Sequence, residues 1–307
     1  MDLVTTKSIL SAHPWVELSD GILPSSIRSM ITHEEQKLLF YLASQYYQGE
    51  GVIADLGTFV GASTWLFGEG IKANQFITNQ ELKYQKPIYC FDIYKYNEAG
   101  DSQFMTEEAS GSFFDEFKCN VSKISEMIEV YVGDVCSFSW SNHLPIEILF
   151  IDVCKTYTTN KCVVNKFFPQ LIPGRSVVIQ QDYCDINWWI HLTMEVMSPY
   201  FEKIEGLVGC SQIFLNTKPI PHDPITLLEQ LTWDEKIQLL EKLIIGTRGF
   251  RRRLLLLSLA SIYISAGKLE QAKTTILEVG EYQSQSNNRL LHRRYQAMCD
   301  IIKSLTK

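Results

Sequence analysis

The first two thirds of the chain alternate between short apolar runs and longer segments with apolar residues at helical spacing. Five runs are too short and too rich in β-branched and aromatic residues for helices, so each predicts a buried β-strand. They cover residues 51–54, 88–92, 128–132, 146–152 and 176–180. One helical segment begins at Thr32, where Glu35 completes an N-capping signature. Strands that alternate with helices predict an α/β fold with a doubly wound, mostly parallel sheet.

The last third of the chain has a different pattern. Two further strands, 201–204 and 211–215, are joined near two glycines and predict a closing hairpin. Three prolines then fall within 219–224 and indicate a linker, because proline neither continues a helix nor pairs in a sheet. The remainder is helical in pattern, in four segments: 225–245, 248–266, 269–282 and 289–305.

We therefore predict three parts. These are an arm or cap over 1–34, an α/β domain over 35–218 and a helical C-terminal domain over 219–307. The middle two helices of the tail resemble one tetratricopeptide unit, although a generic helical hairpin fits as well. A single such unit cannot bury its own apolar face, so we expect the tail to mediate dimerisation or to cover an acceptor site.

Residues 52–64 form the stretch with the clearest functional signal. The pattern predicts a strand that ends at Asp55, a turn with Gly57 and Gly61, and then the start of a helix. The glycines let the backbone turn sharply and approach a ligand, and the helix start adds unpaired N–H groups. We interpret this as a nucleotide-type cofactor site, although a dinucleotide fingerprint and a phosphate loop are both missing. A glycine-bearing turn of another α/β protein is the alternative.

Carboxylates also follow other predicted strands. Asp92 ends the second strand, where it could accept hydrogen bonds from a ribose diol or simply cap the next turn. Asp152 follows the fourth strand, and Gln181 and Asp182 follow the fifth. Because parallel strands bring their carboxyl ends to one edge, these oxygens could bind Mg²⁺. A helix cap at Asp152 and a turn at residues 181–182 are the alternative.

Composition narrows the class of partner. The 307 residues are 46% hydrophobic and 21% charged, as in a soluble globular protein. A formal net charge of −7 argues against a nucleic-acid substrate, which needs a basic face. No apolar stretch is long enough to span a bilayer, and residues 1–14 lack the features of a signal peptide, so we expect no membrane contact and a cytoplasmic protein. Eight scattered cysteines without zinc spacing indicate reduced thiols.

The pattern Asp55-x-Gly57-x-x-x-Gly61 resembles the glycine motif of class I S-adenosylmethionine-dependent methyltransferases. The resemblance covers roughly residues 35–218 and implies a Rossmann-like seven-stranded sheet with one antiparallel strand. It places an acidic residue beside the methionine ammonium of the cofactor and a Gly-Asp pair, here Gly133-Asp134, beside the adenine. The implied cofactor-binding residues are Asp55, Gly57, Thr58, Gly61, Ser63, Asp92, Asp134 and Val135.

The strand-end set looks like that of metal-dependent O-methyltransferases of the catechol, caffeoyl-coenzyme A and macrolide-sugar kinds. Asp152, Gln181 and Asp182 match the three metal positions. Gln181 is a neutral amide in place of a carboxylate, so the ligand set carries one negative charge fewer. Lys155 matches the general base of the catechol type and could equally be a surface lysine. His191 is a second candidate base. It lies near Trp188 and Trp189, whose side chains could line an acceptor site or lie in the core. The catalytic candidates are thus Lys155, His191 and Asp152.

We therefore expect an O-methyltransferase that acts on a small secondary metabolite or sugar, with S-adenosylmethionine, a divalent cation such as Mg²⁺ and a homodimeric assembly. A metal-independent N-methyltransferase is one alternative. A non-catalytic scaffold whose helical tail binds a partner is another. The segments expected to line the acceptor, 1–30, 94–118 and 183–197, carry no recognisable signature.

Overall fold

The computed structural model describes residues 3–78, 83–95, 111–140, 144–281 and 289–305. The chain forms two compact units whose segments interleave along the sequence. The first, which we call the sheet unit, consists of Met1–Cys154, Thr158–Gln181 and Pro199–Pro224. The second, the helical unit, consists of Lys155–Tyr157, Asp182–Ser198 and Ile225–Lys307. The segment 182–198, which the sequence placed in the α/β domain, thus groups with the tail.

The sheet unit is built on a seven-stranded sheet with the order β3-β2-β1-β4-β5-β7-β6. Its strands are β1 (Val52–Leu56), β2 (Ile88–Asp92), β3 (Ile128–Val132), β4 (Ile146–Ile151), β5 (Val177–Gln180), β6 (Phe201–Lys203) and β7 (Gln212–Asn216). The first five strands pair in parallel, whereas β7 runs antiparallel to both β5 and β6. The predicted doubly wound sheet with one antiparallel strand is therefore confirmed, with strand ends shifted by one or two residues.

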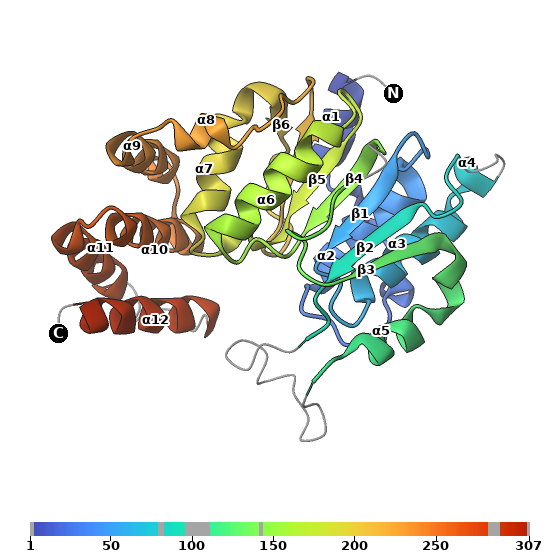
Figure 1. The fold of residues 1–307 in the computed structure, drawn as a ribbon, viewed down its shortest axis with the longest axis horizontal. Coiled ribbons are helices and arrows are strands. Elements are labelled where there is room, and N and C mark those ends of the chain that lie inside the picture. The colour runs from blue at the N-terminus through green and yellow to red at the C-terminus, as the bar shows by residue number, and fades with distance from the viewer. Residues whose placement is uncertain (1–2, 79–82, 96–110, 141–143, 282–288, 306–307) are drawn as a thin grey trace. The chain divides into compact units, whose positions relative to one another are not determined.

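Helices cover both faces of this sheet. Figure 1 shows α6 in front of the strands and α2 and α3 behind them. The helices of the sheet unit are α1 (Leu3–Ser11), α2 (His33–Tyr41), α3 (Ala62–Ala73), α4 (Gln75–Thr78), α5 (Phe114–Asn120) and α6 (Tyr157–Phe167), whose first residue belongs to the helical unit. Thr32 and Glu35 form the predicted capping box at the start of α2. The arm contributes Leu10 and Trp15 to the core, and both are fully buried.

One charged group lies within the apolar run of β4. The side chain of Glu147 is fully buried and accepts hydrogen bonds from Gln48 N at 2.7 Å and Glu50 N at 2.8 Å. It also pairs with the buried guanidinium of Arg175, whose Nε lies 2.8 Å from Glu147 Oε1. The pair ties the loops at the amino edge of the sheet together, because a buried charge is tolerated only with such partners.

The helical unit contains α7 and the tail. Its helices are α7 (Trp188–Val196), α8 (Thr226–Glu229), α9 (Trp233–Ile244), α10 (Gly249–Ser265), α11 (Leu269–Glu281) and α12 (Arg289–Leu305). The predicted helix over 225–245 is divided, because Thr232 and Glu235 form a second capping box that starts α9. The other three predicted tail helices are confirmed. Within the described residues, no helix combines the length and the apolarity that a membrane crossing requires.

Candidate cofactor site

Four strand ends meet at the carboxyl edge of the sheet. Backbone hydrogen bonds continue the ladder beyond the strands, from Gly57 N to Phe91 O, from Asp152 N to Leu56 O and from Gly133 N to Asp92 O, each at 2.8 Å. The residues that follow β1, β2, β3 and β4 are therefore level with one another. Since ligands of open α/β sheets bind outside the carboxyl ends of the strands, this edge is the place for a cofactor.

The turn after β1 requires its two glycines. Gly57 has a φ of +92° and Gly61 a φ of +98°, in the left-handed region that favours glycine. A Cβ at Gly57 would lie 2.7 Å from the carbonyl oxygen of Asp152, and one at Gly61 would lie 2.8 Å from Cγ1 of Val121. The predicted sharp turn is confirmed, and the glycines also allow β4 and the segment after α5 to approach it closely.

Asp92 fixes the middle of this turn. Phe59 has a φ of +47°, which is strained for a bulky side chain. Its N–H donates to Oδ2 of Asp92 at 2.8 Å, and the N–H of Tyr94 donates to Oδ1 at 2.7 Å. Charge-assisted hydrogen bonds of this kind are strong and offset the strain. A carboxylate oxygen can accept more than one hydrogen bond, so the ribose contact of Asp92 stays a prediction.

Asp55 lies behind the turn rather than on its open side. Its carboxyl is completely buried and accepts hydrogen bonds from the hydroxyls of Thr64 at 2.7 Å and Ser63 at 2.9 Å. Burial raises the pKa of Asp55 to about 7, the two hydroxyls oppose the increase, and the charge of Asp92 adds to it. Asp55 therefore holds the first turn of α3 in place, and its predicted contact with the methionine ammonium stays a prediction.

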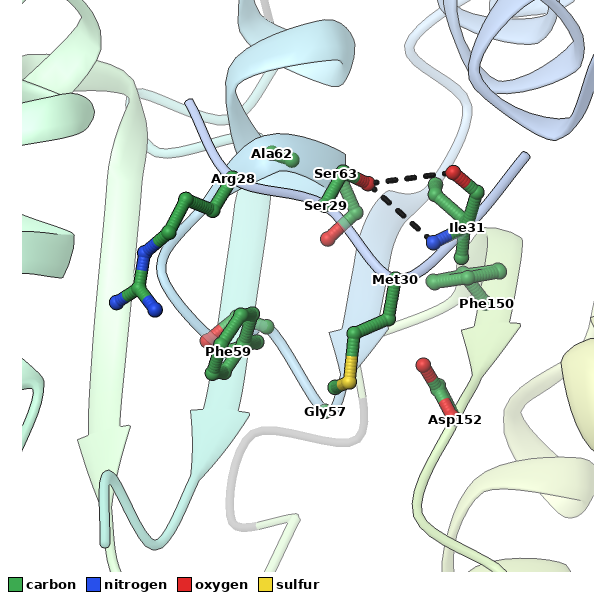
Figure 2. A pocket seen from close by; sticks show the side chains of 11 residues that line it. Arg28, Ser29, Met30, Ile31, Gly57, Phe59, Ala62, Ser63, Phe150 and Asp152 are labelled. Carbon is green, nitrogen blue, oxygen red and sulfur yellow. Dashed lines mark hydrogen bonds between the residues drawn. The ribbon is translucent and has the colours of Figure 1, made fainter. Parts of the chain in front are cut away.

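An opening lies in front of the turn, and Figure 2 shows the side chains that surround it. The space in front of these side chains amounts to about 280 Å³, part of which is open solvent. The arm and the ends of β1 and β4 line it, through Arg28, Ser29, Met30, Ile31, Gly57, Thr58, Phe59, Ala62, Ser63, Phe150 and Asp152. The structure thus brings four predicted site residues, Gly57, Thr58, Ser63 and Asp152, to one opening.

The loop after β3 contains the predicted adenine contacts. Gly133 has a φ of +141°, and Oδ1 of the exposed Asp134 accepts a hydrogen bond from Cys136 N at 2.8 Å. Val135 is buried, and its carbonyl oxygen accepts a hydrogen bond from Nζ of Lys166 at 2.6 Å. The loop is therefore held from within and from α6, and its contact with adenine stays a prediction. Residues 96–110 of the predicted acceptor segment 94–118 lie outside the described residues.

One of the predicted metal ligands, Asp182, has another partner. Nζ of Lys155 lies 2.7 Å from each carboxylate oxygen of Asp182, whose side chain is only 8% exposed. Within the ranges that the structure describes, no three His, Cys, Asp or Glu side chains are grouped to hold a metal ion. Gln181 would add only a neutral oxygen. A lysine ammonium therefore balances the Asp182 carboxylate, and a divalent cation at these residues stays a prediction.

The other two catalytic candidates are also held by neighbours. Lys155 within this ion pair donates hydrogen bonds, whereas a general base must accept a proton. His191 is 2% exposed, and its Nε2 lies 3.3 Å from the carbonyl oxygen of Asp185. Its ring meets that of Tyr183 edge-on at 4.8 Å. Trp188 is 5% exposed, so it belongs to the core of the helical unit and cannot form an acceptor wall by itself.

Comparison by sequence finds no match, either to a family model or to a curated protein. Several solved structures resemble the chain. The O-methyltransferase NovP is 11% identical, with a TM-score of 0.49, over 71% of this chain and 100% of its own. CalS11, a TDP-rhamnose 3'-O-methyltransferase, is 14% identical, with a TM-score of 0.39, over 59% of this chain and 76% of its own. An rRNA methylase from Streptococcus thermophilus is 12% identical, with a TM-score of 0.38, over 63% of this chain and 100% of its own.

The seven-stranded sheet, the antiparallel β7 and the glycine turn after β1 are the features that the sequence resemblance implied. The chain has a Rossmann-like, doubly wound fold of the kind that the resemblance to class I methyltransferases implies. The resemblance places S-adenosylmethionine at the turn after β1, in front of which the opening lies.

The residues around the opening fit S-adenosylmethionine. The start of α3 presents backbone N–H groups, which bind anions such as a carboxylate. Met30 and Phe59 offer apolar surface for the uncharged parts of the cofactor. Arg28 and Asp152 are the one cation and the one anion among the described residues that line it. The carboxylate of the cofactor would find a cationic partner in Arg28, and one of its two positive groups would find an anionic partner in Asp152.

Sequence reasoning did not find Arg28 or Phe59. Arg28 lies in the arm, where no periodic pattern marked any residue, and it reaches the opening only because the arm folds back over the turn. Phe59 lies inside the glycine motif itself. Its position between two turn glycines could have marked it, because a large side chain is unusual in such a turn and therefore indicates a specific role.

Proposed function

We propose that the protein is an S-adenosylmethionine-dependent methyltransferase that methylates a hydroxyl group of a small molecule. The observation that carries the proposal is the glycine turn at the mouth of the opening, where Asp92 holds the backbone of Phe59 and Asp55 holds the start of the following helix. Such a preorganised turn costs backbone strain at Phe59, and strain of this kind is typical of ligand sites.

S-adenosylmethionine supplies an electrophilic methyl group on a sulfonium, which an acceptor oxygen or nitrogen attacks. The new bond to the methyl carbon forms as the carbon–sulfur bond breaks, the thioether leaves, and the acceptor proton would pass to the Asp152 carboxylate or to solvent in the opening. Of the three catalytic candidates, Asp152 is the one that lines the opening, so we assign to it the orientation of the acceptor hydroxyl and the attraction of the positive sulfonium. No step is assigned to a divalent cation, because Lys155 already pairs with Asp182.

Calorimetry with S-adenosylmethionine tests the cofactor. We expect the intact protein to bind it and Asp92→Ala to bind it at least about tenfold more weakly, because the variant releases the amides of Phe59 and Tyr94. Asp115→Asn, at a side chain that is 93% exposed, is the control and should bind as the wild type does. If the wild type binds no adenosyl cofactor, the proposal fails.

Transfer of a labelled methyl group to a panel of phenols, sugars and amines tests the reaction. We propose oxygen as the acceptor atom and a metal-independent step, so hydroxyl acceptors should be methylated in the presence of a chelator. Transfer to amines alone would favour the N-methyltransferase. Activity that a chelator removes and Mg²⁺ restores would favour the metal-dependent type that the sequence suggested, and cofactor binding without any turnover would favour a scaffold.

The assembly and the class of acceptor are part of the same proposal. We propose a homodimer, which light scattering of the purified chain tests directly. A small molecule is favoured over a nucleic acid because the formal net charge is −7. Methylation of RNA under conditions in which no small acceptor reacts would contradict this choice.

A further inference from the structure

Arg28 is held over the cofactor opening by contacts from two other elements. Its guanidinium makes a bidentate ion pair with Glu116 of α5, with Nε 3.1 Å from Oε1 and Nη2 2.5 Å from Oε2. Its Cζ also lies 5.5 Å from the centre of the Phe59 ring. Figure 2 shows Arg28 on the arm, with its guanidinium on the Phe59 side of the opening. The charge is therefore fixed in direction before any ligand arrives.

The distribution of charge around the opening is uneven. Arg28 lies on the arm side, and Asp152 lies at the end of β4. A ligand with a free carboxylate is attracted to the first group and repelled by the second. A guanidinium presents several N–H donors in a planar fork, so it can hold a second carboxylate beside that of Glu116. Its side chain is 37% exposed, which leaves it within reach of a solute.

We propose that Arg28 binds the methionine carboxylate of S-adenosylmethionine and that the arm is thereby part of the cofactor site. This inference rests on the proposed function, because it needs a cofactor with an amino-acid moiety in the opening. The turn that carries Phe59 and the arm that carries Arg28 then bind the same ligand. Residues 24–31 are a recognition element rather than only a cover.

A purely structural role for Arg28 makes a different prediction. If the ion pair only pinned the arm to α5, removal of either Arg28 or Glu116 would weaken every adenosyl ligand to the same extent. If Arg28 binds the carboxylate, removal of Glu116 strengthens binding, because Glu116 no longer neutralises the guanidinium. Only a ligand that carries the carboxylate responds in this way.

Calorimetry of the full chain with two ligands separates these roles. The probes are S-adenosylmethionine and its decarboxylated form, which lacks only the carboxylate. We expect Arg28→Gln to weaken S-adenosylmethionine at least about tenfold and the decarboxylated ligand by less than about twofold. Glu116→Gln should bind S-adenosylmethionine more tightly and leave the decarboxylated ligand unchanged. Because both ligands are compared on one variant, any general loss of folded protein cancels.

Lys118→Gln is the matched control. Lys118 lies on the same helix as Glu116, pairs with Asp115 and does not line the opening, so the same loss of charge there should leave both affinities unchanged. Equal weakening of both ligands by Arg28→Gln, or no change for either, would overturn the inference. If the wild type binds S-adenosylmethionine no more tightly than the decarboxylated ligand, Arg28 does not bind the carboxylate, but the cofactor site itself is still supported. Binding of neither ligand to the wild type would instead overturn the proposed function.

Discussion

Replacement of Asp55 by asparagine should change how the stability of the sheet unit depends on pH. The carboxyl is completely buried, and its pKa is raised from an ordinary value of 3.8 to about 7, mainly by burial. Asparagine has nearly the same shape but does not ionise. The hydroxyls of Ser63 and Thr64 can serve either side chain, because a hydroxyl both donates and accepts.

The sign follows from proton binding. Below the unfolded pKa both states hold the proton, and the contribution of Asp55 to stability is fully present. As the pH rises towards the folded pKa, the unfolded chain releases the proton while the folded chain keeps it, so this contribution is lost. The difference between 3.8 and about 7 corresponds to about 4 kcal/mol in total. About 3 kcal/mol of it is lost between about pH 5 and pH 8.

Urea denaturation of the wild type and of Asp55→Asn across that pH range measures this contribution. The free energy of unfolding of the wild type, minus that of the variant, should fall by about 3 kcal/mol from the acid to the alkaline end. Asp115→Asn, which removes a carboxylate whose side chain is 93% exposed, is the control for the loss of a surface charge. A difference that stays constant over the whole range would refute the reasoning, because Asp55 would then ionise alike in both states.

Two further predictions concern backbone geometry and buried charge. Gly57→Ala should destabilise the protein by about 2–4 kcal/mol, because its φ is +92° and the new Cβ would lie 2.7 Å from the carbonyl oxygen of Asp152. Gly174→Ala, at a φ of +77° with no atom within 4 Å of the new Cβ, should cost only about 1 kcal/mol in the same urea titration. Equal losses would show that the contact with Asp152 is unimportant. Glu147→Gln should lower the free energy of unfolding by about 3–5 kcal/mol, because it leaves the buried Arg175 uncompensated, and an unchanged urea midpoint would contradict this.

The sequence by itself determined the secondary structure of the sheet unit and the place of the cofactor turn. Strands such as β1 and β4 are buried on both faces, and that burial requires continuous apolar runs, which are visible in the sequence. The capping box at Thr32 and the glycines at 57 and 61 are equally local, because a cap and a left-handed turn depend on residues a few positions apart.

Tertiary structure alone decided which side chains meet at the site. Arg28 reaches the opening, and Lys155 pairs with Asp182, because chain segments far apart in sequence are brought together. Asp55 and Asp92 both lie at or next to a strand end and look alike in the sequence. The Asp55 carboxyl is nevertheless buried against the start of α3, whereas the Asp92 carboxylate accepts a hydrogen bond from the turn. The direction of a strand-end side chain depends on the residues packed around it. No local pattern encodes that packing, and it decides whether a carboxylate faces the protein or a ligand.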